Sequence, residues 1–456
     1  MVTYDLIVLG GGPGGFTAAN RAAERGLNTA IFECSKLGGV CLNEGCIPSK
    51  SFIHSSKKSS YSVTPSENKS DYAADISEWI KDKNAAVEQL RNGVRGSLRK
   101  NKVKIIFSKA TIMSYQNGFT TISDAEGNEY STNNLVIAVG SEIFIPPING
   151  VSEALDSGFA LTTSTIFDCN EKFSSLVIVG GGVIGIELAY CFSKCGVKVD
   201  IIESSDKIGA SIDSDATDII EKSLIDSGVE IHKNSCVTEI KENFVLYIYN
   251  DKTQTIKCDK VLVCTGRRPR LSGYGLEKID LVIENRGIST DLKMRTSKSG
   301  VYAIGDVNGK SMLAHTAYRE AEVCVNNIAD ENDQMDYLSV PSVIYGMPEV
   351  ACVGQSVNDV KADGGGFIKK ISMLYSGRAV AEKAAKYGFC KLIFDSNEVL
   401  RGGVIVGEYA SEIILALGLM ISEKYTLAKM KKTVYPHPSV CEIIRETLYS
   451  KSEPIP

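Results

Sequence analysis

The sequence predicts an α/β fold with two similar strand–helix units and a separate α+β domain at the C-terminal end. A strand, a glycine-rich loop and a helix occur near residue 10 and again near residue 180. Each unit then reaches a second strand that ends in an acidic residue. From about residue 340 the pattern changes to isolated strands followed by helices, which indicates a different kind of domain.

The composition is that of an ordinary water-soluble protein. A length of 456 residues suggests roughly three domains. The net charge of -5 argues against nucleic acid as a partner. The longest apolar stretch, Leu176 to Phe192, contains glycines and Glu187, so no membrane span is expected. Thirteen cysteines at mostly irregular spacing, and an N-terminus without a basic region, predict a reducing, cytoplasmic location.

The two units match each other part by part. The first has a strand at Tyr4–Leu9, glycines at 10–15, a helix at Phe16–Arg25, a strand at Thr29–Phe32 and then Glu33. The second has a strand at Leu176–Val179, glycines within 180–185, a helix to Lys194, a strand at Lys198–Ile202 and then Glu203. In both, the acid lies 23 residues after the first glycine of the loop.

This context is that of a Rossmann-like dinucleotide site. The first glycine makes the tight turn, the second lets a pyrophosphate approach the backbone, and the third lets helix and strand pack closely. The acid can accept a hydrogen bond from a ribose hydroxyl. Glu203 is followed by Ser204 and Ser205 with no arginine nearby, which favours NAD over NADP in the second unit, although Lys207 is close.

The remaining segments give weaker signals. A Ser- and Lys-rich stretch, His54 to Asp71, is expected to be a surface loop. Apolar residues from Trp79 to Leu98 predict an amphipathic helix. Strands are expected at 103–107, 119–123, 135–140 and 301–304, a linker at Pro146-Pro147, and helices at 411–422 and 440–450.

Cys41 and Cys46 lie close behind the first glycine loop. A disulfide across so short a loop stabilises a fold by only about 2 kcal/mol, which is little for a chain this long. Redox chemistry explains the pair better, because such a bond opens and closes with little backbone movement. The alternatives are two buried thiols or half of a zinc site; no second Cys/His cluster at metal spacing is evident, so no metal is expected.

With these features the chain resembles the flavin-dependent disulfide reductases, and within them most closely the dihydrolipoyl dehydrogenases. The resemblance covers nearly the whole length. Besides the two glycine loops it rests on residues 39–50 (GVCLNEGCIPSK), 138–141 (AVGS), 185–187 (GIE), 265–269 (TGRRP), 305–306 (GD), 312–315 (MLAH) and 437–442 (HPSVCE).

The resemblance implies FAD in the first site and NAD in the second. Cys41 would exchange with the substrate, Cys46 would lie against the flavin, and Lys50 and Glu187 would pair near its ring. The FAD contacts implied by motif and resemblance are Gly10, Gly12, Gly14, Gly15, Glu33, Gly39, Val40, Lys50, Ala110, Ala138, Gly140, Ser141, Asp306 and Ala314. The NAD contacts are Gly180, Gly182, Ile184, Gly185, Glu203, Val237 and Gly266.

The resemblance also implies an acid–base pair near the C-terminal end. His437 would be the base and Glu442 its orienting carboxylate, and imidazole titrates near working pH. In the family this histidine faces the cysteines of the partner subunit, so a homodimer is expected. Cys441 and the helix from Trp79 are expected to serve packing.

Four regions follow: an FAD-binding domain at 1–147, an NAD-binding domain at 148–270, a central segment at 271–338 packed on the FAD domain, and an interface domain at 339–456. The expected reaction is oxidation of dihydrolipoamide by NAD⁺, with a lipoyl domain or carrier protein of a 2-oxo-acid dehydrogenase or glycine-cleavage complex as partner. The alternatives are a related reductase of a glutathione-like disulfide, or a docking subunit.

The chain departs from the family pattern at five positions. Tyr435 stands where a second histidine is common. Ser439, Val40 and Val139 each replace a threonine, and Glu44 replaces a hydrophobic residue between the cysteines. None of these changes removes a reacting group.

Overall fold

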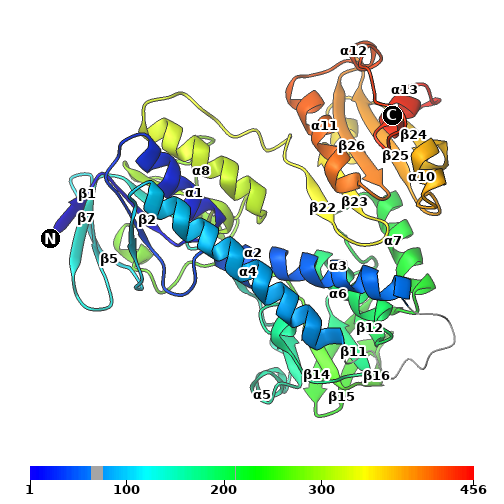
Figure 1. Cartoon of the computed structure of the whole chain (residues 1–456), viewed down its shortest axis with the longest axis horizontal. Helices are drawn as coiled ribbons and strands as arrows, with labels where there is room; N and C mark the ends of the chain where they lie inside the picture. The colour runs from blue at the N-terminus through cyan, green and yellow to red at the C-terminus, as the bar shows by residue number, and fades with distance from the viewer. Residues whose placement is uncertain (63–74, 211, 456) are drawn as a thin grey trace.

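The computed structural model describes residues 1–62, 75–210 and 212–455, and Figure 1 shows its three sheet-containing parts. The first part is built on a five-stranded parallel sheet of order β21-β8-β2-β3-β4. Its strands are β2 (Leu6–Leu9), β3 (Thr29–Phe32), β4 (Lys104–Ile106), β8 (Leu135–Ile137) and β21 (Val301–Ala303). A smaller sheet beside it contains β1 (Val2–Tyr4), β7 (Glu129–Thr132), β6 (Phe119–Ser123) and β5 (Thr111–Gln116).

The second part repeats this design. Its parallel sheet has the order β10-β17-β11-β12-β13, with strands β10 (Ala160–Thr162), β17 (Lys260–Val263), β11 (Ser175–Val179), β12 (Lys198–Ile202) and β13 (Glu230–His232). An antiparallel sheet follows, made of β14 (Ser235–Lys241), β15 (Phe244–Tyr249) and β16 (Lys252–Lys257). Its helices are α5 (Val151–Asp156), α6 (Val183–Lys194) and α7 (Ser214–Asp226). The expected α/β fold with two Rossmann-like units is confirmed.

The third part is a six-stranded antiparallel sheet of order β22-β23-β26-β25-β24-β27. The strands are β22 (Ser342–Ile344), β23 (Val350–Gly354), β26 (Leu400–Val406), β25 (Phe389–Asp395), β24 (Gly366–Ser372) and β27 (Ser452–Ile455). Its helices are α9 (Val357–Ala362), α10 (Gly377–Ala381), α11 (Ala410–Ser422), α12 (Leu427–Met430) and α13 (Glu442–Leu448). Side chains from β25, β26, α11 and α13 form its buried core.

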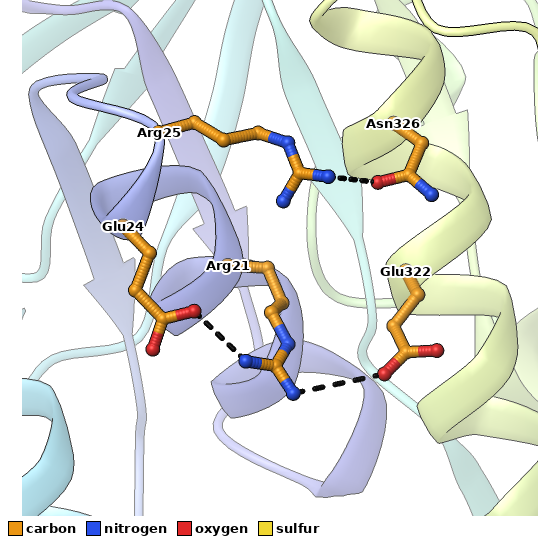
Figure 2. Close-up of a pocket in the computed structure, with 5 residues that line it drawn as sticks. All are labelled: Arg21, Glu24, Arg25, Glu322 and Asn326. Carbon is orange, nitrogen blue, oxygen red and sulfur yellow. Dashed lines mark hydrogen bonds and ion pairs between the residues drawn. The ribbon is translucent and has the colours of Figure 1, made fainter.

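Helix α8 (Ala314–Ile328) returns the chain to the first part after the second is complete. It packs beside α1 (Pro13–Glu24), and β21 just before it joins the first sheet. Figure 2 shows the side chains at this surface: Arg21 lies 3.8 Å from Glu322 of α8 and Arg25 donates to Asn326 of α8, while the contact of Arg21 with Glu24 at 2.8 Å is within α1. The shallow pocket between them holds paired charges, which offer no convergent apolar surface for a ligand.

Two expectations about the first part are wrong in detail. The strand expected at Tyr4–Leu9 is split at Asp5 into β1 and β2, which belong to different sheets. The loop expected from His54 is a continuation of helix α3 (Cys46–Ser62), while residues 63–71 lie outside the described part. Packing explains the helix, because Phe52, Ser55 and Ser56 are buried although their neighbours are polar.

Helices α3 and α4 (Asp75–Lys100) extend from the first part across to the second (Figure 1). Phe52 of α3 makes edge contacts with Trp79 of α4 and Phe167, with ring centroids 5.7 and 5.1 Å apart. These rings belong to the same buried cluster as α6 and residues of β23, β25 and β26. The position of α3 is therefore fixed by both of the other parts, and α4 is the expected packing helix.

A buried cation joins the second part to the third. Lys391 of β25 is 3% exposed, and its Nζ lies 2.8 Å from both carboxylate oxygens of Asp213, the residue that caps α7. The same Nζ also contacts Asp215, which pairs with the more exposed Lys370 at 2.8 Å. This cluster fixes α7 against the third sheet, where Figure 1 shows it.

Replacing Lys391 with alanine should lower the free energy of unfolding by about 3–5 kcal/mol, because Asp213 would be left without its buried cation. Lys370→Ala is the matched control, and its loss should stay at about 1 kcal/mol or less because that lysine is partly exposed. Denaturant unfolding followed by circular dichroism measures both. Equal losses in the two variants would contradict this account.

Candidate active site

Two short helices carry the cysteine pair. Cys41 lies in α2 (Gly39–Asn43) and Cys46 is the first residue of α3, so a turn of only Glu44 and Gly45 separates the helices. As two thiols, these cysteines make up the reduced form of the pair. A sulfur at the N-terminal end of a 17-residue helix faces the positive end of the helix dipole, which favours a thiolate.

The two thiols have unequal acidity. Cys41 donates to Cys46, and this hydrogen bond, together with burial, raises the pKa of Cys41 well above its ordinary range. The same hydrogen bond and the positive charge of Lys50 lower the pKa of Cys46, against the effect of burial. The first proton therefore leaves from Cys46, and Cys41 keeps the second one.

Lys50 lies one turn further along α3 and pairs with Glu187 of α6. Its Nζ is 3.1 and 2.9 Å from the two carboxylate oxygens. Glu187 is 3% exposed and also accepts a hydrogen bond from the backbone N–H of Tyr345 at 3.0 Å. The ring of Tyr345 lies 4.1 Å from the Lys50 ammonium. The sequence gave no sign of Tyr345, because it lies 158 residues beyond Glu187 and its role depends on tertiary contact.

A second polar group connects residues 141, 267 and 306. Asp306 accepts a hydrogen bond from the Ser141 hydroxyl. Arg267 donates to the Ser141 Oγ at 2.8 Å and to the Ser141 backbone oxygen at 2.9 Å. Burial lowers the pKa of Arg267 although the charges of Asp306 and Glu44 oppose this. Arg267 stands in the sequence motif at 265–269, yet no role was assigned to it there.

The redox loop is also supported from α4. Arg91 donates to the Asn43 side-chain oxygen through Nε at 3.1 Å and Nη2 at 2.9 Å. The Asn43 amide in turn donates to the backbone oxygens of Leu37 at 3.1 Å and Gly39 at 2.8 Å. All four contacts hold α2, and hence Cys41, in one orientation. Nothing in the sequence indicated that Arg91 would contact Asn43.

His437 and Glu442 form the expected pair at the start of α13. The imidazole Nδ1 lies 3.0 and 3.1 Å from the two oxygens of Glu442, which also accepts the Ser439 N–H at 3.0 Å. That backbone hydrogen bond and the one from His437 lower the pKa of Glu442. The histidine side chain is 79% exposed. Figure 1 shows α13, the helix that begins at Glu442, at the far side of the third part from α2.

The residues around this pair are accounted for by packing. Tyr435 packs against the buried core of the third part, and burial raises its pKa to about 12, so it cannot take the place of a second histidine base. Cys441 contacts the Ser439 hydroxyl at 3.0 Å. Away from this pair, the ring of His315 on α8 contacts the Pro341 backbone oxygen at 2.7 Å.

The first glycine loop is shaped for close backbone approach. Gly10 has a φ of +103°, and a Cβ there would lie 2.3 Å from the Ala138 oxygen. A Cβ on Gly15 would lie 1.8 Å from the Gly10 oxygen, so α1 could not pack on β2. Glu33 accepts hydrogen bonds from the N–H of Gly11 at 2.9 Å and of Ser35 at 2.7 Å.

Other residues expected around this loop lie on both sides of it. Gly12 and Gly14 flank the start of α1, and Gly39 approaches Gly12 so closely that a Cβ would lie 2.6 Å from the Gly12 Cα. The rest are spread over neighbouring elements: Val40 is in α2, Ala110 is 2% exposed before β5, Gly140 has a φ of +73° beside β9 (Ser141–Ile143), and Ala314 begins α8.

The second loop repeats this geometry and borders a cavity of about 380 Å³. Gly180 has a φ of +107°, and Glu203 accepts the Gly181 N–H at 2.7 Å, as Glu33 does in the first unit. A Cβ on Gly182 would meet nothing within 4 Å, which leaves room for a phosphate. The expected NAD residues that line the cavity are Gly180, Gly182, Glu203, Val237 and Gly266, while Ile184 and Gly185 lie in the first turn of α6.

Among the described residues one group has metal-ligating types close together, namely Asp200, Glu230 and His232, whose ligand atoms lie within 4.8 Å of one another. Lys198 lies 3.5 Å from Glu230 and 3.9 Å from Asp200, so a cationic side chain already balances these carboxylates.

Within the described residues, no helix is long and apolar enough to cross a bilayer.

Comparison with known families agrees with this geometry. Residues 4–321 match the pyridine nucleotide-disulphide oxidoreductase model, and residues 340–448 match the dimerisation domain of the same family. The chain therefore belongs to the pyridine nucleotide-disulphide oxidoreductases, whose cofactors are FAD and NAD(H). The dimerisation domain agrees with the expected homodimer.

Individual proteins that resemble this chain give a more specific comparison than the family models. A dihydrolipoyl dehydrogenase of Geobacillus stearothermophilus is 36% identical, with 98% of this chain and 95% of that protein covered. A dihydrolipoyl dehydrogenase of Mycoplasma genitalium is 33% identical, with 97% of each covered. Two solved structures share the fold at 23% identity: LpdA of Mycobacterium tuberculosis (TM-score 0.87) and the flavoprotein disulfide reductase RclA of Escherichia coli (TM-score 0.86), each with 98% of this chain and 99% of that chain covered.

The residues present fit both cofactors. Each glycine loop has backbone N–H groups at a helix N-terminus, where a pyrophosphate binds, and an acid that can meet a ribose. Ser141 and Asp306, which are hydrogen-bonded to each other, offer further polar atoms.

Replacing Lys50 with methionine should raise the pKa of the Cys46 thiol, because the ammonium lowers that pKa in the native chain. The measurement is the pH dependence of alkylation of the reduced protein by iodoacetamide. Glu187→Gln is the counterpart and should move the same profile to lower pH, because the Glu187 charge raises the Cys46 pKa. Profiles that do not move in opposite directions would refute this electrostatic account.

Proposed function

We propose that this chain is a dihydrolipoyl dehydrogenase, which oxidises dihydrolipoamide with NAD⁺ through a Cys41–Cys46 disulfide. The observation that carries the proposal is the unequal thiol pair, placed at the N-terminus of α3 next to the Lys50–Glu187 ion pair. The curated relatives over the full length support the same substrate.

The proposed reaction begins with the oxidised pair. One thiolate of dihydrolipoamide attacks the Cys41 sulfur, the Cys41–Cys46 bond breaks, and Cys46 leaves as a thiolate. The second substrate thiolate then attacks the first substrate sulfur, which forms lipoamide and releases Cys41, and Cys41 takes a proton. A bound FAD supplies the transfer of the two electrons from the reduced pair to NAD⁺ as a hydride. The helix terminus and Lys50 stabilise the Cys46 thiolate in the reduced state.

We place the base in the other subunit of the homodimer. His437 of the partner subunit would accept the first proton of dihydrolipoamide at Nε2, and Glu442 would hold the ring through Nδ1. The exposure of His437 and its position in the matched dimerisation domain support this. The low pKa of Glu442 keeps its carboxylate ionised through neutral pH, and the orientation is lost only under acidic conditions.

We assign FAD to the loop at Gly10–Gly15 and NAD(H) to the loop at Gly180–Gly185. Helix α2, which carries Cys41, approaches the first loop closely, because a Cβ on Gly39 would lie 2.6 Å from the Gly12 Cα, and this suits the flavin. We propose the domain boundaries expected from the sequence, at residues 147, 270 and 338, together with this assignment. The electron donor would be a lipoyl group carried by another protein of a 2-oxo-acid dehydrogenase or glycine-cleavage complex, and a cytoplasmic location fits the many thiols.

The purified flavoprotein should reduce NAD⁺ with dihydrolipoamide and should not oxidise NADPH with glutathione disulfide. Both rates are read from absorbance at the nicotinamide band. Cys46→Ser should abolish turnover while FAD stays bound, because the leaving thiolate is lost. A Cys46→Ser protein with normal turnover would refute the mechanism, and glutathione reduction would favour the alternative reductase.

His437→Gln should lower kcat by about 100-fold or more, because glutamine cannot accept the substrate proton. His54→Gln is the matched control; that histidine is exposed on α3 and its variant should keep the native rate. The pH profile of kcat gives a second measurement, since the variant should recover as the substrate thiol ionises at high pH. A parallel loss in both variants would argue against a base at His437.

Glu203→Ala should raise the KM for NAD⁺ by about 10- to 100-fold, because a hydrogen bond between a charged acceptor and a ribose hydroxyl is lost. Glu221→Gln serves as the control, since Glu221 pairs with Lys233 at 2.7 Å on α7 and lies outside the residues that line the cavity. Initial rates at varied NAD⁺ measure both. An unchanged KM would place the nucleotide elsewhere.

A further inference from the structure

Glu320 is a buried carboxylate to which the proposed reaction gives no task. It lies in α8 and is 0% exposed. Its Oε2 accepts the backbone N–H of Gly305 at 2.5 Å, and its Oε1 accepts the side-chain N–H of Asn308 at 2.9 Å. The hydroxyl of Tyr337 also donates to Oε1, at 2.7 Å. None of these three donors carries a charge. Burying a carboxylate among neutral groups is costly, and an apolar side chain would serve simple packing better.

The donors from Gly305 and Asn308 stand at the two ends of one short helix, η4 (Gly305–Asn308), which contains Asp306. Strand β21 ends two residues before η4 and runs parallel to β8 and β2, so η4 and the first glycine loop leave the same edge of the first sheet. A Cβ on Gly14 would lie 3.2 Å from the Ile304 side chain, directly before η4. The turn that carries Asp306 therefore packs beside the first glycine loop.

We propose that Glu320 is a positioning residue for FAD, which holds both ends of η4 and thereby keeps Asp306 at the first nucleotide loop. The inference rests on the proposed function, in its assignment of FAD to this loop, and it is independent of the thiol substrate. Glu320 fixes the backbone around Asp306, while the Ser141 hydroxyl donates to the Asp306 carboxylate and fixes the side chain. An acid that is already in place need not be ordered when FAD binds, so the cofactor is held more tightly.

Glu320→Gln tests this proposal with little change in volume. The native carboxylate accepts three donors at two oxygens, whereas an amide accepts at one atom and turns N–H groups toward the remaining donor. The measurement is the rate at which the holoenzyme releases FAD, followed by ultrafiltration and the flavin absorbance of the filtrate. We expect release to become about ten- to a hundredfold faster, because a hydrogen bond that holds a buried turn is lost.

Two single variants accompany this one. Glu322→Gln is the control on the same helix, since Glu322 is partly exposed and lies 3.7 Å from Arg319 and 3.8 Å from Arg21, and FAD release should stay at the native rate. Tyr337→Phe removes one of the three hydrogen bonds and leaves both contacts to η4, so it should accelerate release by about two- to tenfold. It also keeps the proposal testable if Glu320→Gln does not fold.

A double substitution separates positioning from general stability. In an Asp306→Ala background, Glu320→Gln should change FAD release by less than about threefold, because the group that it positions is already absent. NADH binding at the second loop should stay native in Glu320→Gln. Native FAD release in both Glu320→Gln and Tyr337→Phe, or the same acceleration with and without Asp306, would overturn the proposal. Wild-type flavoprotein that is inactive with dihydrolipoamide would instead refute the proposed substrate.

Discussion

The hydrogen bond between Cys41 and Cys46, at the N-terminus of α3, is the interaction on which the rest of the site depends. It gives one sulfur a raised pKa and the other a lowered pKa, so a single negative charge has a fixed place. Helix α3 supplies the dipole and, one turn later, the cation Lys50. Any movement of α3 would change all three at once, which explains why it is packed from several sides.

The packing of α3 connects the site to the whole molecule. Phe52 contacts Trp79 and Phe167, and the same buried cluster includes residues of the third sheet. Glu187 reaches Lys50 from α6, directly after the second glycine loop. The two glycine-loop units and the dimerisation domain therefore meet around one helix, the one that begins at Cys46. This arrangement is suited to passing electrons from a thiol pair toward a second nucleotide.

The charges around the pair also balance each other. Lys50 is paired with the buried Glu187, and Arg267 is balanced by Asp306 and Glu44. Lys50 lowers the pKa of Cys46, and the charge of Glu187 opposes that effect. A disulfide that is reduced and reoxidised in every turnover needs neither form to be strongly preferred. Paired charges of both signs meet this requirement, whereas isolated lysine and arginine residues would hold the pair in its reduced form.

The sequence by itself determined the two nucleotide units, the cysteine pair and the His437–Glu442 spacing, because each depends on residues close together in the chain. Glycine loops, strand periodicity and an acid at a fixed distance are local features. It failed where packing overrides composition, as in the polar segment after His54 that α3 keeps helical. Only the tertiary structure brought Ser164 to Glu44, Tyr345 to Glu187 and Arg91 to Asn43, across 120, 158 and 48 residues. Such contacts leave no local pattern, since they arise when separate elements close around α3.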